Sequence, residues 1–101
     1  MSIIFKKIFF RPSNEIEFYV EPQLFLDHVT SMYINTGKCI RFREKSLIDA
    51  DLSVQVVESE WVDRQGYDEF LSDPLSIANK ELIIAHNQEV GIMLVGIDSD
   101  V

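Results

Sequence analysis

The side chains of this sequence best suited to acid–base chemistry or to polar ligand contacts are His28, Tyr33 and Tyr67. Imidazole titrates near neutral pH, so His28 could accept a proton from a substrate in a cleft. A buried tyrosine must give its hydroxyl a partner, and a bound ligand can be that partner. These residues predict a proton acceptor with one or two hydroxyl donors beside it.

The same residues also have a structural interpretation. His28 follows Asp27 on a predicted helix, where a single hydrogen bond would satisfy the imidazole. Tyr33 flanks the apolar stripe of one predicted helix, and Tyr67 shares the inner face of another with Phe70 and Leu71, so both fit a hydrophobic core. The sequence leaves the catalytic and the structural interpretations open.

Other kinds of catalytic site and a metal site are not indicated. Cys39 is the only cysteine, and no neighbouring histidine could activate it. Two separate histidines and one cysteine do not form a metal-ligand spacing. The sequence also lacks a glycine-rich phosphate loop, a serine nucleophile elbow and paired carboxylates. We therefore expect neither a metal nor a cofactor.

Length and composition predict a single domain, residues 1–101, with one hydrophobic core. The first ten residues mix lysines with hydrophobic residues, which is typical of a strand rather than of a signal peptide. No apolar run reaches the roughly 20 residues that span a bilayer. One cysteine permits no intrachain disulfide. These features predict a cytoplasmic protein that does not contact a membrane.

The net charge of −8 is unevenly distributed along the chain. Residues 1–45 carry a net charge of +2, whereas residues 46–101 carry a net charge of −10 and contain only Arg64 and Lys80 as basic residues. Nucleic-acid binding depends on clustered Lys and Arg, so this balance disfavours a nucleic-acid partner.

A short basic stripe is formed by Arg41, Arg43 and Lys45. At alternate positions of a predicted strand these side chains share one face. We interpret that face as solvated. The alternatives are an anion site and a contact with the acidic half of a second subunit.

The first half of the chain predicts a strand, a helix and a strand. Residues 3–10 are short and rich in β-branched and aromatic residues, which favours a strand. Pro22 opens a helix that Gly37 ends, and a half-buried strand follows at residues 39–43. The inner stripe of the helix is predicted to be Phe25, Val29 and Met32.

The second half predicts a strand, two helices and a strand. After a turn at residues 46–51, the hydrophobic parity changes near Val56 within the next strand, which predicts a β-bulge there. Asp63 is the expected N-cap of a short helix with Phe70 in the core, and residues 92–97 are the expected last strand before a loose tail. The second helix is predicted to face the core through Leu75, Ala78, Leu82 and Ala85.

This order of elements predicts an α+β fold of the ferredoxin-like kind, in which an antiparallel sheet carries helices on one face. A strand that is covered on one side should alternate between apolar and polar residues. Residues 92–97 are apolar on both faces instead. We therefore expect the uncovered sheet face to bind a second copy of the chain and form a homodimer.

The segment from Ser59-Glu60-Trp61 to Phe70-Leu71-Ser72-Asp73 resembles the dimeric α+β-barrel superfamily, in particular its antibiotic-biosynthesis-monooxygenase branch. The shared features are a strand that ends in an aromatic residue, a short helix with an aromatic-Leu pair, and a Ser-Asp break. The resemblance covers about residues 25–97. It implies two subunits packed sheet to sheet and a ligand cleft between each sheet and its own helices.

The resemblance does not extend to the haem-degrading branch. The Trp and the haem-ligating His of that branch correspond to Phe70 and Lys80 of this chain. Phenylalanine lacks the indole donor, and a protonated lysine is a poor iron ligand. We expect no haem.

Two functions remain open, because one fold can carry many functions. The first is a homodimer that binds a small apolar ligand in the cleft. The second is a cofactor-independent monooxygenase or isomerase that uses His28 with Tyr33 or Tyr67. The expected ligand contacts of the first function are Phe25, Met32, Trp61 and Phe70.

The filling of the cleft should distinguish the two functions. A cleft that contains His28 and a tyrosine favours the enzyme. A cleft filled by apolar side chains favours binding or a structural role, and the side chains expected to fill it are Phe25, Met32, Phe70 and Leu82.

Overall fold

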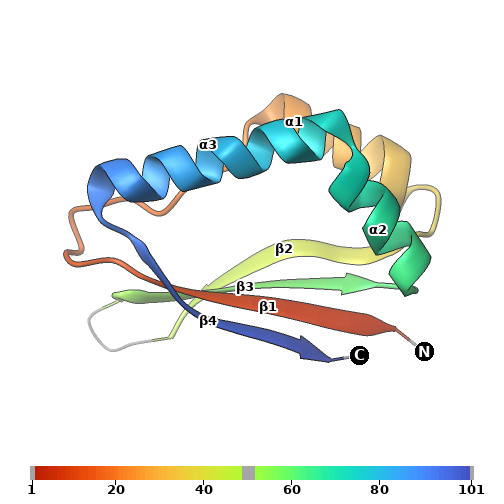
Figure 1. The fold of residues 1–101 in the computed structure, drawn as a ribbon. Helices are drawn as coiled ribbons and strands as arrows, with labels where there is room; N and C mark the ends of the chain where they lie inside the picture. The colour runs from red at the N-terminus through yellow and green to blue at the C-terminus, as the bar shows by residue number, and fades with distance from the viewer. Residues whose placement is uncertain (1, 49–51, 101) are drawn as a thin grey trace.

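A computed structural model describes residues 2–48 and 52–100. The elements are β1 (Ile3–Phe10), α1 (Gln23–Val29), a π-helical turn η1 (Thr30–Ile34), β2 (Cys39–Leu47), β3 (Val54–Trp61), α2 (Arg64–Ser72), α3 (Pro74–Val90) and β4 (Met93–Asp100). The strands form one antiparallel sheet in the order β2-β3-β1-β4. Figure 1 shows the helices above one face of this sheet. The expected α+β class is confirmed, and the arrangement is compatible with a ferredoxin-like fold.

The central strand β1 presents alternate residues to the two sheet faces. Phe5 and Lys7 line a cavity together with helix residues, and Phe9 belongs to a buried cluster, so these three side chains point toward the helices. Ile8 lies between them in sequence and pairs with Val56 on the opposite, outer face. The sheet therefore has an inner face under the helices and an outer face that no described element covers (Figure 1).

The buried stripe of α1 differs from the predicted one in its last residue. Phe25 and Val29 are buried as expected, but Tyr33 continues the stripe and Met32 is 50% exposed. The cause is η1, in which a backbone N–H bonds to the carbonyl five residues earlier. A π-turn is wider than an α-turn, so the inward position moves one residue further along the chain. Gly37 then adopts the expected left-handed conformation, with φ of 79°.

The predicted bulge in β3 is wrong. β3 pairs with β1 without a register shift along its whole length, from Val54 to Trp61. Val57 and Trp61 point to the inner face, and Val56 points to the outer face. The change of hydrophobic parity near Val56 therefore reflects no inserted residue. At the start of β3 the apolar residues, Val54 and Val56, face outward and the polar Gln55 faces inward, whereas further along Val57 and Trp61 face inward.

The register shifts of this edge lie in β2 instead. β2 pairs with β3 with one irregularity between Cys39 and Arg41 and another between Arg41 and Glu44. Within the second irregularity Arg43 has a left-handed backbone, with φ of 49°. A bulge changes which face the following side chains occupy. The prediction that Arg41, Arg43 and Lys45 share one face is therefore wrong.

The two arginines of β2 lie on opposite faces of the sheet. Arg41 binds Glu58 and Glu60 at 2.5 and 3.0 Å on the outer face. Arg43 lines the inner cavity. Lys45 is also on the inner side, where its ammonium pairs with Glu21.

Two aspartates begin the C-terminal helices. The Asp63 carboxylate accepts a hydrogen bond from the Gly66 backbone N–H at 3.0 Å, which confirms it as the N-cap of α2. Asp73 caps α3 in the same way, through the Leu75 N–H at 2.9 Å, with Pro74 in the first position of the helix. Capping bonds of this kind satisfy backbone donors that the helix itself leaves free.

The predicted inner stripe of α3 is wrong. Ser76 and Asn79 are the buried residues of this helix, and Ile83 lines the cavity beside them. The helix carries apolar side chains on more than one face, so hydrophobic periodicity did not identify its inward side. The four residues of the predicted stripe, Leu75, Ala78, Leu82 and Ala85, are exposed.

The core forms two clusters of buried residues on the inner face. The larger one joins α1, η1 and the ends of β2 and β3, and the smaller one centres on Phe9, Val57 and Ile92. Phe70 is half-buried and packs against the larger cluster, so it belongs to the core boundary rather than to the interior. The buried residues of the larger cluster are Phe25, Val29, Tyr33, Cys39 and Trp61.

Strands β2 and β4 extend beyond their predicted C-terminal ends. β2 continues to Leu47, where a turn was expected, and residues 49–51 of that turn lie outside the described residues. β4 continues to Asp100, so the expected loose tail is wrong for residues 98–100, and Val101 lies outside the described residues. Antiparallel pairing with β1 holds this last segment.

Candidate ligand-binding cleft

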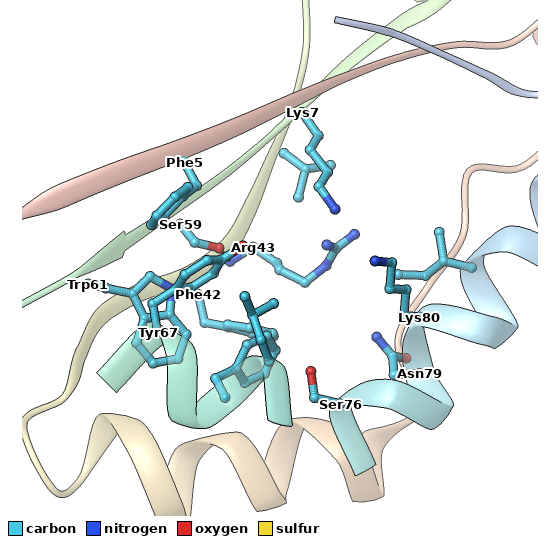
Figure 2. A pocket seen from close by; sticks show the side chains of 14 residues that line it. Phe5, Lys7, Phe42, Arg43, Ser59, Trp61, Tyr67, Ser76, Asn79 and Lys80 are labelled. Atoms are coloured by element: carbon cyan, nitrogen blue, oxygen red, sulfur yellow. Dashed lines mark hydrogen bonds between the residues drawn. The ribbon is translucent and has the colours of Figure 1, made fainter. Parts of the chain in front are cut away.

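A cavity of about 270 Å³ lies between the inner sheet face and the helices α2 and α3. Its size is close to the lower limit of ordinary small-molecule pockets, roughly 300 Å³. Figure 2 shows that side chains from the sheet and from both helices point into it. One end of the cleft is aromatic and the other end is polar and basic.

The aromatic end is held in place by ring packing. Phe5 and Tyr67 stack with ring centroids 4.0 Å apart. Trp61 lies 5.1 Å from Phe70 and is fully buried. Its indole N–H has no acceptor among the described residues. Phe42 completes this aromatic wall at 5.4 Å from Phe70. Such a wall offers an apolar surface to a ligand.

The basic end collects three cations from three separate elements. Lys7 comes from β1, Arg43 from β2 and Lys80 from α3, and all three line the cavity. Figure 2 shows their charged ends directed toward one another. The fold therefore concentrates positive charge at one point of a strongly acidic protein. Because like charges repel each other, this arrangement is electrostatically unfavourable without a bound anion.

The partners of these cations are few. The Arg43 guanidinium lies 3.3 Å from the Glu21 carboxylate, which also pairs with Lys45. Glu21 is 3% exposed in its side chain. Lys7 and Lys80 make no hydrogen bond or ion pair with the residues that the structure describes. The basic end therefore carries more positive charge than its neighbours neutralise.

The pKa of Lys7 reflects this environment. Burial lowers it below the ordinary value for lysine, and the neighbouring charges of Arg43 and Lys80 lower it further. Both causes act against the charged form of the amine. An anion bound in the cleft would raise the pKa of Lys7, because it favours the charged form of the amine.

The bulge in β2 positions Arg43. Its left-handed backbone directs the side chain inward, and its N–H donates to the Ser59 hydroxyl at 2.9 Å. Ser59 itself lines the cavity from the neighbouring strand. The Arg43 side chain is 14% exposed, so the strand holds this residue largely away from solvent.

His28 and Tyr33 lie outside the cleft. Both donate to the same oxygen of Asp73, His28 Nε2 at 2.6 Å and the Tyr33 hydroxyl at 2.7 Å. Burial alone would raise the pKa of Asp73, but these two hydrogen bonds and the one from the α3 backbone hold it below its usual value. Burial and the bond to Asp73 raise the pKa of Tyr33. The cluster fastens α1 and η1 to the start of α3.

The other predicted site residues are divided between cleft, core and surface. Tyr67, Trp61 and Phe70 line the cavity. Burial is the main cause of the raised pKa of Tyr67. Phe25 is buried in the core, and Met32 is half exposed. The structure therefore brings together one predicted tyrosine and two predicted ligand contacts, but not His28 with a tyrosine in the cleft.

Cys39 behaves as a core residue. It is buried beside the aromatic cluster, and burial raises the pKa of its thiol to about 11. A thiol with this pKa is almost entirely protonated at neutral pH, so it is a weak nucleophile.

Sequence reasoning missed the residues that give the cleft its charge. Lys7 and Lys80 belong to no motif, and Arg43 is part of a stripe that was interpreted as solvated. One available signal was that Lys7 alternates with Phe5 and Phe9, which places it on their face. The Asp-Pro pair before the last helix was a signal for the cap at Asp73.

Comparison with known protein families, curated proteins and solved structures gives no significant match to this chain. In residues 2–48 and 52–100, no three His, Cys, Asp or Glu side chains converge to hold a metal ion. No helix among these residues is long and apolar enough to cross a membrane. Function has to be inferred from the cleft itself.

Proposed function

We propose that this protein binds a small organic molecule in the cleft between its sheet and its helices, and that it does so as a ferredoxin-like homodimer in the cytoplasm. The observation that carries the proposal is the cavity of about 270 Å³ with an aromatic wall and a few polar groups at one end. Ligand sites typically combine an apolar lining with a small number of placed polar side chains.

Binding is favoured over catalysis by the position of His28. A general base must come within hydrogen-bond distance of the proton that it removes. His28 is engaged by Asp73 and does not line the cavity. Tyr67 does line it, but its raised pKa makes it a donor rather than a base at neutral pH. An oxygenase or isomerase that uses His28 is therefore not the function we propose.

The homodimer is supported by the outer sheet face. Register pairs Phe10 with Val54 and with Met93, and Ile8 with Val56, so these apolar residues form one patch across three strands. Met93 is 55% exposed. Beyond this patch the outer face is charged, with the ion pairs of Arg41. An apolar patch with a polar rim fits association with a second copy.

The ligand-binding proposal can be tested with the fluorescence of Trp61, the only tryptophan of the chain. Compounds of one or two aromatic rings, charged and neutral, are titrated into the purified protein. We expect a saturable change for at least one of them. In Ser76→Phe the added ring occupies the cleft, so the change should disappear, whereas Ser72→Phe on the exposed side of α2 should keep it. Saturation that is equal in both variants would contradict binding in this cleft.

A further inference from the structure

We propose that the ligand of this cleft is an organic anion, with an oxyanion group such as a carboxylate bound by Lys7, Arg43 and Lys80 and a flat apolar body against the aromatic wall. This inference rests on the proposed ligand binding and names the chemical class of the ligand. The basis is the separation of the cavity lining into an aromatic end and a cationic end.

The first argument is the excess of positive charge. Three cations converge in the cavity (Figure 2). Arg43 pairs with the Glu21 carboxylate, but this carboxylate is already shared with Lys45. None of the described residues that line the cavity is acidic. Lys7 is half-buried and has no partner among the described residues, which is unfavourable for its charge; an entering anion relieves both its desolvation and its repulsion by Arg43 and Lys80.

The second argument is the hydrogen-bonding character of the polar neighbours. Asn79 accepts the Tyr19 hydroxyl through Oδ1 at 2.7 Å, so its amide N–H groups remain as donors. Figure 2 shows the Asn79 side chain below Lys80, and the Ser76 hydroxyl belongs to the lining of the same cavity. Lysine and arginine supply donors only. The basic end therefore presents donors almost exclusively, which suits a group that only accepts.

The third argument is that the cations and the aromatic rings line the same cavity at different ends. Arginine and lysine bind carboxylates through charge-assisted hydrogen bonds, and arginine does so with a planar fork. The rings of Phe5, Tyr67 and Phe70 line the same cavity as these cations. A molecule with a planar apolar body and one acidic group fits both ends at once, whereas a purely inorganic anion uses only the basic end.

The test compares three probes of matched size or charge by calorimetry and Trp61 fluorescence: 2-naphthoate, the neutral 2-naphthalenemethanol and inorganic phosphate. We expect 2-naphthoate to bind at least about ten-fold more tightly than the alcohol, since one charge-assisted contact is enough for that ratio. Its affinity should fall as salt is added, because the contact is electrostatic. Phosphate should bind more weakly than 2-naphthoate.

Lys7→Met and Lys80→Met are the informative variants. Each should weaken 2-naphthoate by about ten-fold and leave the alcohol unchanged. Lys6→Met is the matched control, because Lys6 is the neighbour of Lys7 on the outer face and pairs with Glu58 at 3.5 Å. It should bind all probes as the parent protein does, and circular dichroism should show the same fold in all three.

The possible outcomes separate this inference from the proposed function. Equal affinity for the naphthoate and the alcohol would overturn the anion assignment and leave ligand binding in place. Phosphate binding as tight as naphthoate binding would overturn the role of the aromatic wall. Absence of binding by all three probes would count against both the inference and an organic ligand in this cleft.

Discussion

Arg41 and Arg43 are two residues apart in β2 and lie on opposite faces of the sheet. In a regular strand these two side chains would share a face. The irregularity between Arg41 and Glu44, with the left-handed backbone of Arg43, separates them. Arg41 consequently neutralises carboxylates on the outer face, while Arg43 adds its charge to the cleft. One inserted residue thus decides the chemistry of both faces.

The left-handed backbone of Arg43 predicts that a glycine variant is more stable than an alanine variant, the reverse of the order at an ordinary strand position. Both Arg43→Gly and Arg43→Ala remove the guanidinium, so they differ only in the backbone. A left-handed conformation costs an L-residue about 1–2 kcal/mol, and glycine avoids this cost. We expect Arg43→Gly to be more stable than Arg43→Ala by about 1 kcal/mol in urea denaturation. An ordinary strand position would give the opposite order, because glycine weakens a strand.

The charge of Lys7, which has no partner in residues 2–48 and 52–100, predicts a stabilising substitution. Lys7→Met keeps the length of the side chain and removes a cation that its surroundings disfavour. We expect the free energy of unfolding to rise by about 0.5–1 kcal/mol, the gain reduced by the partial solvent access of the amine. Lys6→Met on the outer face should change it by less than about 0.5 kcal/mol. A lower melting temperature for Lys7→Met would show that the charge is compensated.

Removal of the Asp73 side chain should reduce the stability of the fold more than removal of an ordinary helix cap. Asp73→Ala removes the α3 cap and the acceptor of His28 and Tyr33 together. We expect a cost of about 2–4 kcal/mol, one cap plus two hydrogen bonds to a charged group. Asp63→Ala, which removes a cap alone, should cost about 1 kcal/mol. Equal losses in the two variants, measured by denaturation, would show that the bonds to Asp73 add nothing.

The lowered pKa of Asp73 also predicts how stability depends on pH. A carboxyl whose pKa is lower in the folded state than its reference value of 3.8 contributes stability that is fully present above that value. The contribution disappears as the pH falls through the folded-state pKa. Asp73→Asn keeps the shape and the capping ability but not the charge. The stability difference between parent and variant should therefore shrink as the pH falls below 3.8.

The outer sheet face predicts a variant that dissociates the homodimer. Met93→Glu places a charge in the apolar patch, opposite Phe10. We expect sedimentation at micromolar concentration to show monomers for this variant and dimers for the parent protein. Leu82→Glu on α3 is the control, since Leu82 has a similar exposure of 50% but lies on the helical side. A parent protein that sediments as a monomer would exclude this interface.

The sequence was sufficient for the order of the elements and insufficient for some of their bounds and inner faces. Alternation and capping residues identified β1, the N-cap at Asp63 and the turn at Gly37, because these signals are local. The inward side of α3 is decided by Asn79 bonding to Tyr19, a contact across 60 residues. Hydrophobic periodicity cannot report such a contact.

The candidate site was partly predictable for the same reason. The sequence identified three of the cavity-lining residues as possible ligand contacts: Trp61, Tyr67 and Phe70. Aromatic residues on the inward faces of strands and helices line any cavity between them. Arg43 could not be placed, since bulges change the parity on which strand assignments depend. His28 depended on the direction of one side chain, which Asp73 determines from another element.

The position of β2 at the end of the strand order gives its two irregularities a further effect. A regular edge strand exposes a row of free backbone groups on which another chain can continue the sheet and begin a fibre. β2 interrupts that row twice and carries charged side chains at Arg41, Arg43, Glu44 and Lys45. The distortion that turns a guanidinium inward thus also protects this border of the sheet against aggregation.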